Sequence, residues 1–434
     1  MYKIQLTITA LSPLAIGRKK PGSVSEASDY IPGSVIRGAI ASELIQRLGQ
    51  PAPGDDFYSL FLDENYAIFS NAYPATAKGK KEQNKEYAII AEEVRILPAT
   101  AVSSKTQPGF KTAKGNGVFD TLIDNFCAES RDLFYDPSCP TAIEKGNDGR
   151  VEPYTGFYSK FYSKLGEYKY YTHSVSKRLL TRVGINRRRA TSEEEILYSI
   201  EVLNEQFSIK RSLQLVQWES TIYKSCISIE TDEDLANKII AFINGNSEAF
   251  RLGGSTSRGL GRVKIEAIQI NNENKIEERI NNFNQKLRER WHEWSVLGKP
   301  RQNLTSERTF FTINLEADAI LTENWRRTTV ISEEMLCQFA NLEELKKDLK
   351  LHATYSSYDY LSGWNSAWGL MKDVELVTNK GSVYLFSISA NRTNQWIEAL
   401  SQLKMKGVGD RTSEGFGQIE ICSEFHQIFR KDVK

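Results

Sequence analysis

The stretch GGSTSRGLGRVKI, residues 253–265, nearly recurs toward the end of the chain as GDRTSEGFGQIEI, residues 409–421. After each loop an alternating apolar pattern begins, at Val263 and at Ile419, which predicts a strand at the same place in both copies. Self-similarity of this kind indicates two related supersecondary units. Aligned without gaps, the copies match Gly253 with Gly409, Thr256 with Thr412, Ser257 with Ser413, Gly259 with Gly415, and Gly261 with Gly417.

The segments around each loop also follow one order: strand, helix, strand pair, helix, strand. That order predicts a ferredoxin-like unit in each half of the chain and therefore an α+β protein. The first helix has a plausible N-cap in Ser34, directly after the turn expected at Pro32–Gly33. In the first half we expect strands over 3–9, 196–203, 214–220 and 262–270, and helices over 29–48 and 232–245. In the second half we expect strands over 310–317, 382–389 and 418–425, and helices over 333–349 and 395–404.

The periodicity also suggests domain limits. The first ferredoxin-like domain is expected over 1–271, with a large irregular insertion at about 52–176 where clear periodicity is lost. The segment 272–307 carries a highly charged helix and reads as a helical connector. The second ferredoxin-like domain is expected over 308–434.

Composition narrows the class of partner. The 434 residues carry a formal net charge of +1, so a nucleic-acid partner would have to be held by local clusters of cations. The five cysteines are scattered and odd in number, which fits a reducing cytosol better than a disulfide framework. No apolar run approaches the length of a membrane span. We therefore expect a cytoplasmic protein without a membrane partner.

The glycine loops are candidates for binding an anion, because glycine lets backbone N–H groups approach a ligand closely. Each loop follows a helix and precedes a strand, which is the reverse of a Walker or dinucleotide-binding loop and excludes both. The hydroxyls and arginines of the first loop instead suit an extended polyanion, chiefly RNA. The alternative is that the glycines only permit tight packing of helix on strand. The second loop favours that alternative more, since Glu414 and Gln418 replace Arg258 and Arg262.

A second cluster of cations lies in KRLLTRVGINRRR, residues 177–189. The apolar residues between the cations predict a hairpin arm, and neutralising phosphates with such an arm would give salt-sensitive binding. A merely solvated face is the alternative, and the acidic run at 193–195 could quench the charge. The cations are Lys177, Arg178, Arg182, Arg187, Arg188 and Arg189.

Several segments together resemble the RAMP superfamily of CRISPR effector proteins, in particular the RAMP subunit of type III-D complexes first described from cyanobacteria. The arm is similar to that of subunits that hold the repeat-derived handle of the guide RNA. The segments that carry the resemblance are TALSPLAIG (9–17), YIPGSVIRGAI (30–40), TRVGINRRRATSEEEILYSIEV (181–202), GGSTSRGLGRVKI (253–265), GWNSAWGL (363–370) and KGVGDRTSEGFGQIEI (406–421).

The resemblance implies tandem ferredoxin-like (RRM-like) domains and a non-catalytic subunit of a type III ribonucleoprotein effector complex in antiviral defence. Such a subunit binds CRISPR RNA near its five-prime handle. It contacts the large polymerase-like subunit and backbone RAMP subunits, and meets target RNA indirectly. With the cation clusters, this predicts RNA contacts at Arg37, Lys177, Arg178, Arg182, Arg187, Arg188, Arg189, Gly253, Gly254, Ser255, Ser257, Arg258, Gly259, Gly261 and Arg262, and weaker ones at Lys406 and Arg411.

No residues assemble a catalytic set in the sequence. RNA cleavage without metal generally needs a positioned acid and base, commonly histidine, and His173 is the histidine nearest the basic arm. Asp120 and Asp29 are the acidic candidates for metal-assisted cutting, although a lone aspartate is more often a cap or turn residue. A metal-independent endoribonuclease that processes CRISPR RNA is the main alternative, and a protein scaffold with vestigial loops is a third.

Relatives, as the resemblance implies, often carry further cysteines in a zinc ribbon. Here only Cys127 and Cys139 stand in that region, and a closed zinc site needs about four ligands. We therefore expect neither a metal site nor a cofactor.

Overall fold

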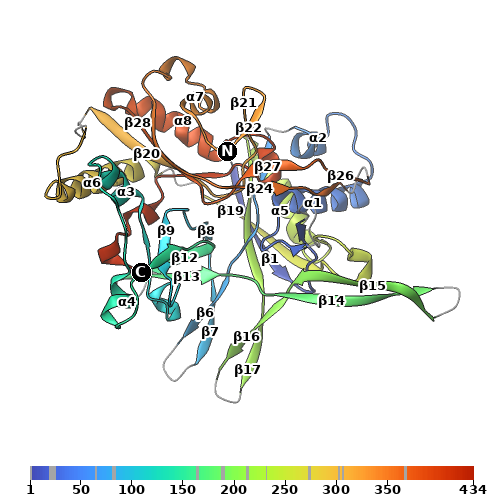
Figure 1. Ribbon diagram of the computed structural model, residues 1–434. Helices are drawn as coiled ribbons and strands as arrows, with labels where there is room; N and C mark the ends of the chain where they lie inside the picture. The colour runs from blue at the N-terminus through green and yellow to red at the C-terminus, as the bar shows by residue number, and fades with distance from the viewer. Residues whose placement is uncertain are drawn as a thin grey trace. The chain divides into compact units, whose positions relative to one another are not determined.

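The computed structural model divides the chain into two compact units, each assembled from separate stretches of sequence (Figure 1). Unit 1 comprises Met1–Glu93, Ser174–Asn271 and Tyr360–Leu376, and unit 2 comprises Val94–His173, Asn272–Asp359 and Val377–Lys434. The structure describes residues 2–18, 26–63, 66–80, 85–162, 166–186, 191–211, 215–230, 232–271, 275–301, 304, 307–365 and 369–434.

Unit 1 is built on an antiparallel sheet with the strand order β19-β1-β18-β4. In β1 alternate residues are buried, as the sequence pattern predicts, and Ile4 and Ile8 share one core with Ile36 of α1 and Ile239 of α5. The apolar stripes of the two helices therefore cover this sheet. The elements are β1 (Tyr2–Ala10), α1 (Gly33–Leu48), β4 (Ala67–Phe69), β18 (Ile222–Ile229), α5 (Glu233–Gly245) and β19 (Val263–Ile270).

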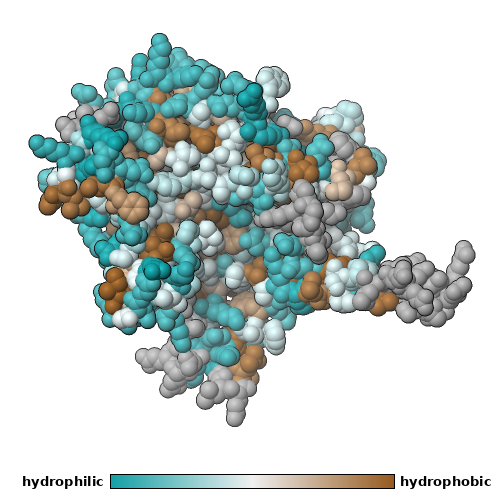
Figure 2. Space-filling view, in the orientation of Figure 1, coloured by the Kyte–Doolittle hydropathy of each residue, from teal (hydrophilic) through white to brown (hydrophobic). Residues whose placement is uncertain are grey.

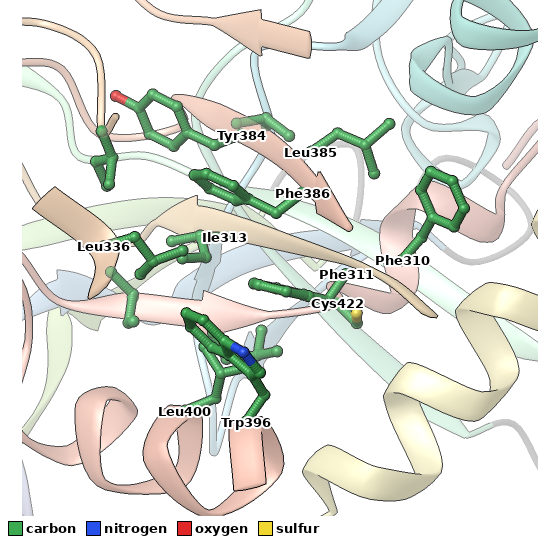
Figure 3. Packing of buried hydrophobic residues seen from close by; sticks show 14 of the residues in the cluster. Phe310, Phe311, Ile313, Leu336, Tyr384, Leu385, Phe386, Trp396, Leu400 and Cys422 are labelled. Carbon is green, nitrogen blue, oxygen red and sulfur yellow. The ribbon is translucent and has the colours of Figure 1, made fainter. Parts of the chain in front are cut away.

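Unit 2 repeats this plan, with the strand order β23-β28-β20-β29 and antiparallel pairing throughout. In both units the strand that comes first along the chain, β1 or β20, lies in the sheet between the third and the fourth strands of that unit. Phe311 of β20 stacks on Phe386 of β28 and packs against Trp396 of α8 (Figure 3). The elements are β20 (Arg308–Leu315), α7 (Glu333–Phe339), β23 (Lys350–Tyr355), β28 (Val383–Ser389), α8 (Thr393–Lys406) and β29 (Ile419–Ile421).

Smaller elements decorate both units. Unit 1 carries the hairpins β6–β7, β14–β15 and β16–β17, and unit 2 carries two small sheets of the order β10-β9-β11 and β13-β12-β8. Their bounds are β2 (Gly17–Arg18), β3 (Glu26–Ala27), α2 (Asp56–Phe61), β5 (Tyr73–Pro74), β6 (Thr76–Lys80), β7 (Glu86–Ile90), β8 (Arg95–Ile96), β9 (Ala101–Ser104), β10 (Val118–Asp120), α3 (Leu122–Glu129), α4 (Pro140–Glu144), β11 (Val151–Pro153), β12 (Phe157–Tyr162), β13 (Tyr168–His173), β14 (Lys177–Asn186), β15 (Thr191–Leu203), β16 (Gln206–Lys210), β17 (Val216–Ser220), β21 (Leu321–Glu323), β22 (Arg326–Thr328), β24 (Tyr358–Leu361), β25 (Trp364–Asn365), β26 (Leu370–Met371) and β27 (Glu375–Thr378).

Several local features differ from the sequence-based expectations. Residues 67–74, expected to be irregular, supply β4 and β5, which pair with β18 in the sheet of unit 1. Residues 94–173 of the expected insertion group with unit 2. Helix α6 (Ile276–Trp294), expected to be a connector, buries Ile280 and Phe283 in the core of unit 2.

The predicted N-cap of α1 is wrong. The helix begins at Gly33, so Ser34 lies inside its first turn, and Pro32 is the N-cap residue. The N–H of Gly33 donates instead to Oδ1 of Asn71, at 2.8 Å. A side chain distant in sequence therefore satisfies one of the free N–H groups that a local cap usually takes. Elsewhere, no helix within the described ranges is long and apolar enough to cross a bilayer.

The half-buried His352 of β23 makes the stability of unit 2 depend on pH. Its ring lies against Phe310 and its Nε2 is 2.7 Å from Oγ of Ser387. Burial, with a smaller effect of nearby Lys350 and Arg308, lowers the pKa of His352 from 6.5 to about 4. Between pH 6.5 and pH 4 the imidazole of His352 is therefore protonated in the unfolded chain but mostly neutral in the folded protein. The free energy of unfolding falls as the pH falls through this range.

We expect unfolding in denaturant to show this loss, on the order of 1 kcal/mol between about pH 7 and about pH 5. The variant His352→Gln keeps a polar side chain but cannot titrate, so its stability should fall less over the same interval. Equal slopes in the two proteins would contradict the assignment to His352.

Candidate nucleic-acid interface

The two glycine loops have the same backbone conformation, as the sequence repeat predicts. At the aligned positions the chain takes positive φ angles in both copies, and each loop contains one short 3₁₀ turn, Thr256–Arg258 or Thr412–Glu414. The φ angles are +88° at Gly253 and +80° at Gly409, +57° at Ser255 and +58° at Arg411, +83° at Gly259 and +94° at Gly415, and +81° at Gly261 and +63° at Gly417.

The first loop is held by the segment that follows β1. The N–H of Gly254 donates to the carbonyl of Ala15, and the N–H of Gly261 donates to the carbonyl of Pro13, each at 2.9 Å. A Cβ on Gly253 would lie 2.5 Å from the Ala15 oxygen, and one on Gly261 would lie 2.5 Å from the Leu252 oxygen. At these two positions glycine is therefore required by close approach of the protein's own backbone.

The second loop repeats these contacts with the segment after β20. The N–H of Asp410 donates to the carbonyl of Ile320, and the N–H of Gly417 donates to the carbonyl of Asp318, each at 2.9 Å. The shared hydrogen bonds give the repeated glycines a structural role in both units. Residues 254 and 256–259 of the first loop are nevertheless exposed, so the tip of that loop is accessible to a ligand.

The basic segment forms the predicted hairpin, because β14 pairs with β15 in antiparallel register. At the base of this arm, Val202 is buried with Leu260 and Ala15, and Leu180 and Ile200 pack on the same cluster. This cluster joins the arm to the first glycine loop within unit 1. Periodicity predicts the arm and the strand after the loop. It does not predict that arm and loop pack together, because that contact depends on apolar residues distant in sequence.

The contact between arm and loop brings Arg182, Arg258 and Tyr198 together. Arg182 Nη1 donates to the carbonyl of Arg258, at 3.1 Å. The Arg258 guanidinium lies 5.4 Å from the ring centroid of Tyr198 and donates to its hydroxyl. Tyr198 stands opposite Arg182 in the hairpin register, and it is not among the RNA contacts expected from the sequence. The sequence feature that could identify Tyr198 is an aromatic residue placed opposite a cation in a predicted hairpin.

Two further cations stand on the same arm. Arg178 pairs with Glu205, with Nη2 2.9 Å from Oε2, and Lys177 donates to the carbonyl of Ala27. Their positive charge is therefore partly engaged within the protein. We use the name arm–loop surface for Lys177, Arg178, Arg182, Tyr198 and Arg258. Figure 2 also shows hydrophobic residues along the described part of the arm.

Arg37 and Arg262 are not part of the arm–loop surface. The Arg37 guanidinium donates to the carbonyl of Phe61 at the end of α2, so it is held inside the helical layer of unit 1. Arg262 is exposed, with its backbone N–H bound to Oγ of Ser12 at 2.9 Å. Arg187, Arg188 and Arg189 lie outside the described residues.

The second loop is electrostatically different from the first. Arg411 pairs with Glu414, with Nη2 2.6 Å from Oε2, and Asp410 pairs with Arg327 at 2.7 Å. Lys406 is exposed at the last position of α8. Glu414 thus neutralises the charge of Arg411, which gives a physical reason for the weaker role predicted from the sequence of this loop.

The histidine and aspartate candidates for catalysis are buried. His173 is only 1% exposed, with Nε2 2.6 Å from Oγ of Ser159. Asp120 accepts hydrogen bonds from Oγ1 of Thr100 at 2.6 Å and from the N–H of Leu122 at 2.8 Å. Its Oδ2 also lies 3.1 Å from Nδ1 of the buried His426. In this structure neither candidate can meet an RNA strand, while Asp29 is half-buried.

The cysteines suggested by the zinc ribbon are both buried. Burial raises the pKa of the Cys127 thiol from 9.0 to about 12, and Cys139 Sγ donates weakly to the carbonyl of Asn116, at 3.6 Å. Within the part of the chain that the structure describes, no three His, Cys, Asp or Glu side chains are grouped to hold a metal ion.

The chain matches the RAMP superfamily over residues 7–264, more than half of its length. It therefore belongs to the RAMP superfamily. No curated protein matches the chain.

Similar solved structures include a chain of the type III-B Cmr-beta complex bound to cognate target RNA and AMPPnP, with 12% identity, coverage of 88% of this chain and 86% of that chain, and a TM-score of 0.35. Cmr4 from Pyrococcus furiosus is 11% identical, with coverage of 62% and 100% and a TM-score of 0.26. A Cas6 product complex is 8% identical, with coverage of 47% and 76% and a TM-score of 0.28. At these scores the similarity is too low to carry a functional inference.

Proposed function

We propose that the protein is a non-catalytic subunit of a type III CRISPR ribonucleoprotein effector complex in the cytoplasm. It binds CRISPR RNA, near the five-prime handle, through the arm–loop surface, and meets target RNA only indirectly. Its protein partners are a large polymerase-like subunit and backbone RAMP subunits. Membership of the RAMP superfamily and the arm–loop surface support this proposal. We further propose that the main antiparallel sheets and their helices within 1–271 and within 308–434 are tandem ferredoxin-like repeats.

The observation that carries the proposal is the joint placement of Arg182, Arg258 and Tyr198. Both guanidiniums are held by neutral oxygens, a carbonyl and a phenol, and among the described side chains no carboxylate pairs with either. Their positive charge is therefore available to phosphate, and each guanidinium keeps further N–H donors. The side chains of the acidic run 193–195 lie outside those described.

A non-catalytic role fits the burial of the candidate acids and bases. General acid–base cleavage requires a group within hydrogen-bond reach of the reacting RNA oxygen. His173 and Asp120 are instead bound to protein groups in the interior of unit 2. A purified preparation should therefore bind repeat-derived RNA without cutting it, in EDTA and in Mg²⁺ alike. Specific cutting that is lost in His173→Ala would overturn this part of the proposal.

The proposal is tested by the double variant Arg182→Ala, Arg258→Ala. We expect its affinity for repeat-derived RNA to fall about tenfold or more, since a hydrogen bond to a charged group contributes about 1.5–3 kcal/mol. The slope of log affinity against log salt should also become shallower, by about 0.7 for each phosphate that the variant no longer neutralises. Fluorescence anisotropy at several salt concentrations measures both quantities.

Arg411→Ala is the matched control, because this arginine is already paired with Glu414. Its removal should leave RNA affinity nearly unchanged. If wild type has no salt-dependent affinity for RNA, or if the double variant binds as well as wild type, the protein is better described as a protein scaffold.

A further inference from the structure

The hairpin β21–β22 in unit 2 presents a fully exposed tryptophan at its tip. Trp325 is 100% exposed, and both residues of the turn have positive φ, +48° at Asn324 and +65° at Trp325. Two-residue hairpin turns with this geometry usually carry Asn followed by Gly. A bulky residue in the left-handed region is rare and strained, so tryptophan at this position is not explained by the stability of the turn.

The hairpin is fixed beside the second glycine loop. An isolated bridge pairs Ile320 with Asp410, and Arg327 of β22 pairs with the same aspartate at 2.7 Å. Thr322 of β21 donates to Asp410 as well, at 3.1 Å. These contacts fix the base of the hairpin against the second glycine loop, and the tip projects from that base.

The first unit has an equivalent hairpin, β2–β3, in the same place along the chain. It too follows the first strand of its sheet, and the bridge from Ala15 to Gly254 joins that segment to the first glycine loop. In unit 1 Arg258 stands on the loop itself. In unit 2 the loop's arginine is paired with Glu414. The sequence places cations in both hairpin segments, at residues 18–20 and at residues 326–327, but only the second segment carries a tryptophan, Trp325.

We propose that Trp325 and Arg326 form a second contact for single-stranded RNA, in which the indole stacks on an unpaired base and the guanidinium binds a phosphate. This rests on the proposed function of the chain as an RNA-binding subunit. Arg326 is exposed. Glu323 stands opposite it in the hairpin and accepts a hydrogen bond from the hydroxyl of Ser332. Aromatic platforms beside cations are the common means of holding single strands without reading their sequence.

The surroundings of Trp325 favour RNA over a protein partner. Hot spots in protein interfaces cluster with other apolar residues that exclude water. Here the residues next to the indole along the hairpin are Glu323, Asn324, Arg326 and Arg327, all polar. A hydrophobic pocket of a neighbouring protein would bury little apolar surface here beyond the indole itself, whereas the arginines would attract the phosphates of RNA.

The test compares wild type with Trp325→Ala and Trp325→Phe in binding a short unstructured RNA oligonucleotide, followed by anisotropy. Stacking on one base corresponds to a loss of about fivefold to about a hundredfold in affinity for Trp325→Ala. Trp325→Phe keeps an aromatic face and should retain most of the affinity. RNA should quench tryptophan fluorescence in wild type, and this quenching should be smaller in Trp325→Phe.

Trp218 is the matched control, since it is also exposed on a hairpin strand, β17, but stands between Gln217 and Glu219. Trp218→Ala should bind RNA as wild type does. Trp325→Gly suits the positive φ of the turn and should not be less stable than wild type, so that a loss of affinity in this variant cannot be blamed on misfolding.

Equal RNA affinity in wild type, Trp325→Ala and Trp325→Gly would overturn this inference. If Arg182→Ala, Arg258→Ala still weakens binding in the same experiment, the proposed function survives that result. Absence of RNA binding by wild type would overturn both. If the Trp325 variants bind RNA normally but fail to associate with another protein of the complex, the hairpin is a protein contact and the inference is wrong.

Discussion

Gly417→Ala is expected to destabilise unit 2 by more than about 3 kcal/mol, enough to unfold a marginally stable unit. A Cβ at this position would lie 1.8 Å from the carbonyl oxygen of Val408, and the glycine has φ +63°. The two segments cannot simply move apart, because the N–H of Val408 donates to the Gly417 carbonyl at 2.8 Å. Denaturant unfolding followed by circular dichroism measures the loss.

Gly259→Ala separates the effect of backbone strain from that of steric clash. Gly259 has φ +83° but nothing lies within 4 Å of where its Cβ would stand. Only the cost of a left-handed alanine remains there, about 1 kcal/mol. If the two variants lost equal stability, the close approach of the chains in the second loop would not be the reason for its glycine.

Asp120→Ala is expected to cost about 3 kcal/mol of stability, because it deprives several buried groups of their partner at once. The carboxylate accepts from the Thr100 hydroxyl and from the N–H of Leu122 and lies next to His426. Water cannot replace it freely, since Asp120 is only 2% exposed. Thermal and denaturant unfolding both report the change.

Asp29→Ala is the natural comparison, since Asp29 was the other acidic candidate and is half-buried. It should change stability by no more than about 0.5 kcal/mol. The pair also tests the enzyme alternative. An Asp120→Ala protein with wild-type stability that had lost an RNA-cutting activity would show that this carboxylate serves chemistry instead of the fold.

Much of the fold could be predicted from periodicity and repetition. The alternation in residues 3–9 and the apolar spacing in 232–245 predict β1 and α5, because one face of each must be buried. Residues 67–74 escaped prediction, since β4 is buried at all three positions and a short solid apolar run has no diagnostic period. Helix α6 was misread because its buried stripe, which includes Ile280 and Phe283, is narrow within a highly charged sequence.

For the candidate site, too, the sequence predicts the elements but not the contacts between them. Composition identifies the arm and the first loop, but not that Leu180 and Val202 pack near Leu260 and bring the two together. Likewise the position of Arg37 after a turn is visible in the sequence, whereas the hydrogen bond from its guanidinium to the Phe61 carbonyl is not. The packing partners of a side chain depend on long-range contacts, which one sequence does not display.

The repeated pattern is enough to establish that two related units each end in a glycine loop and a strand, because backbone conformation and strand alternation are local properties. The contacts of those loops are visible only in the folded chain. It shows which glycines meet backbone carbonyls, which arginines meet acids, and which cations keep their charge, as at Arg258. The reason is that charge neutralisation and close approach act between atoms adjacent in space, however far apart they stand along the chain.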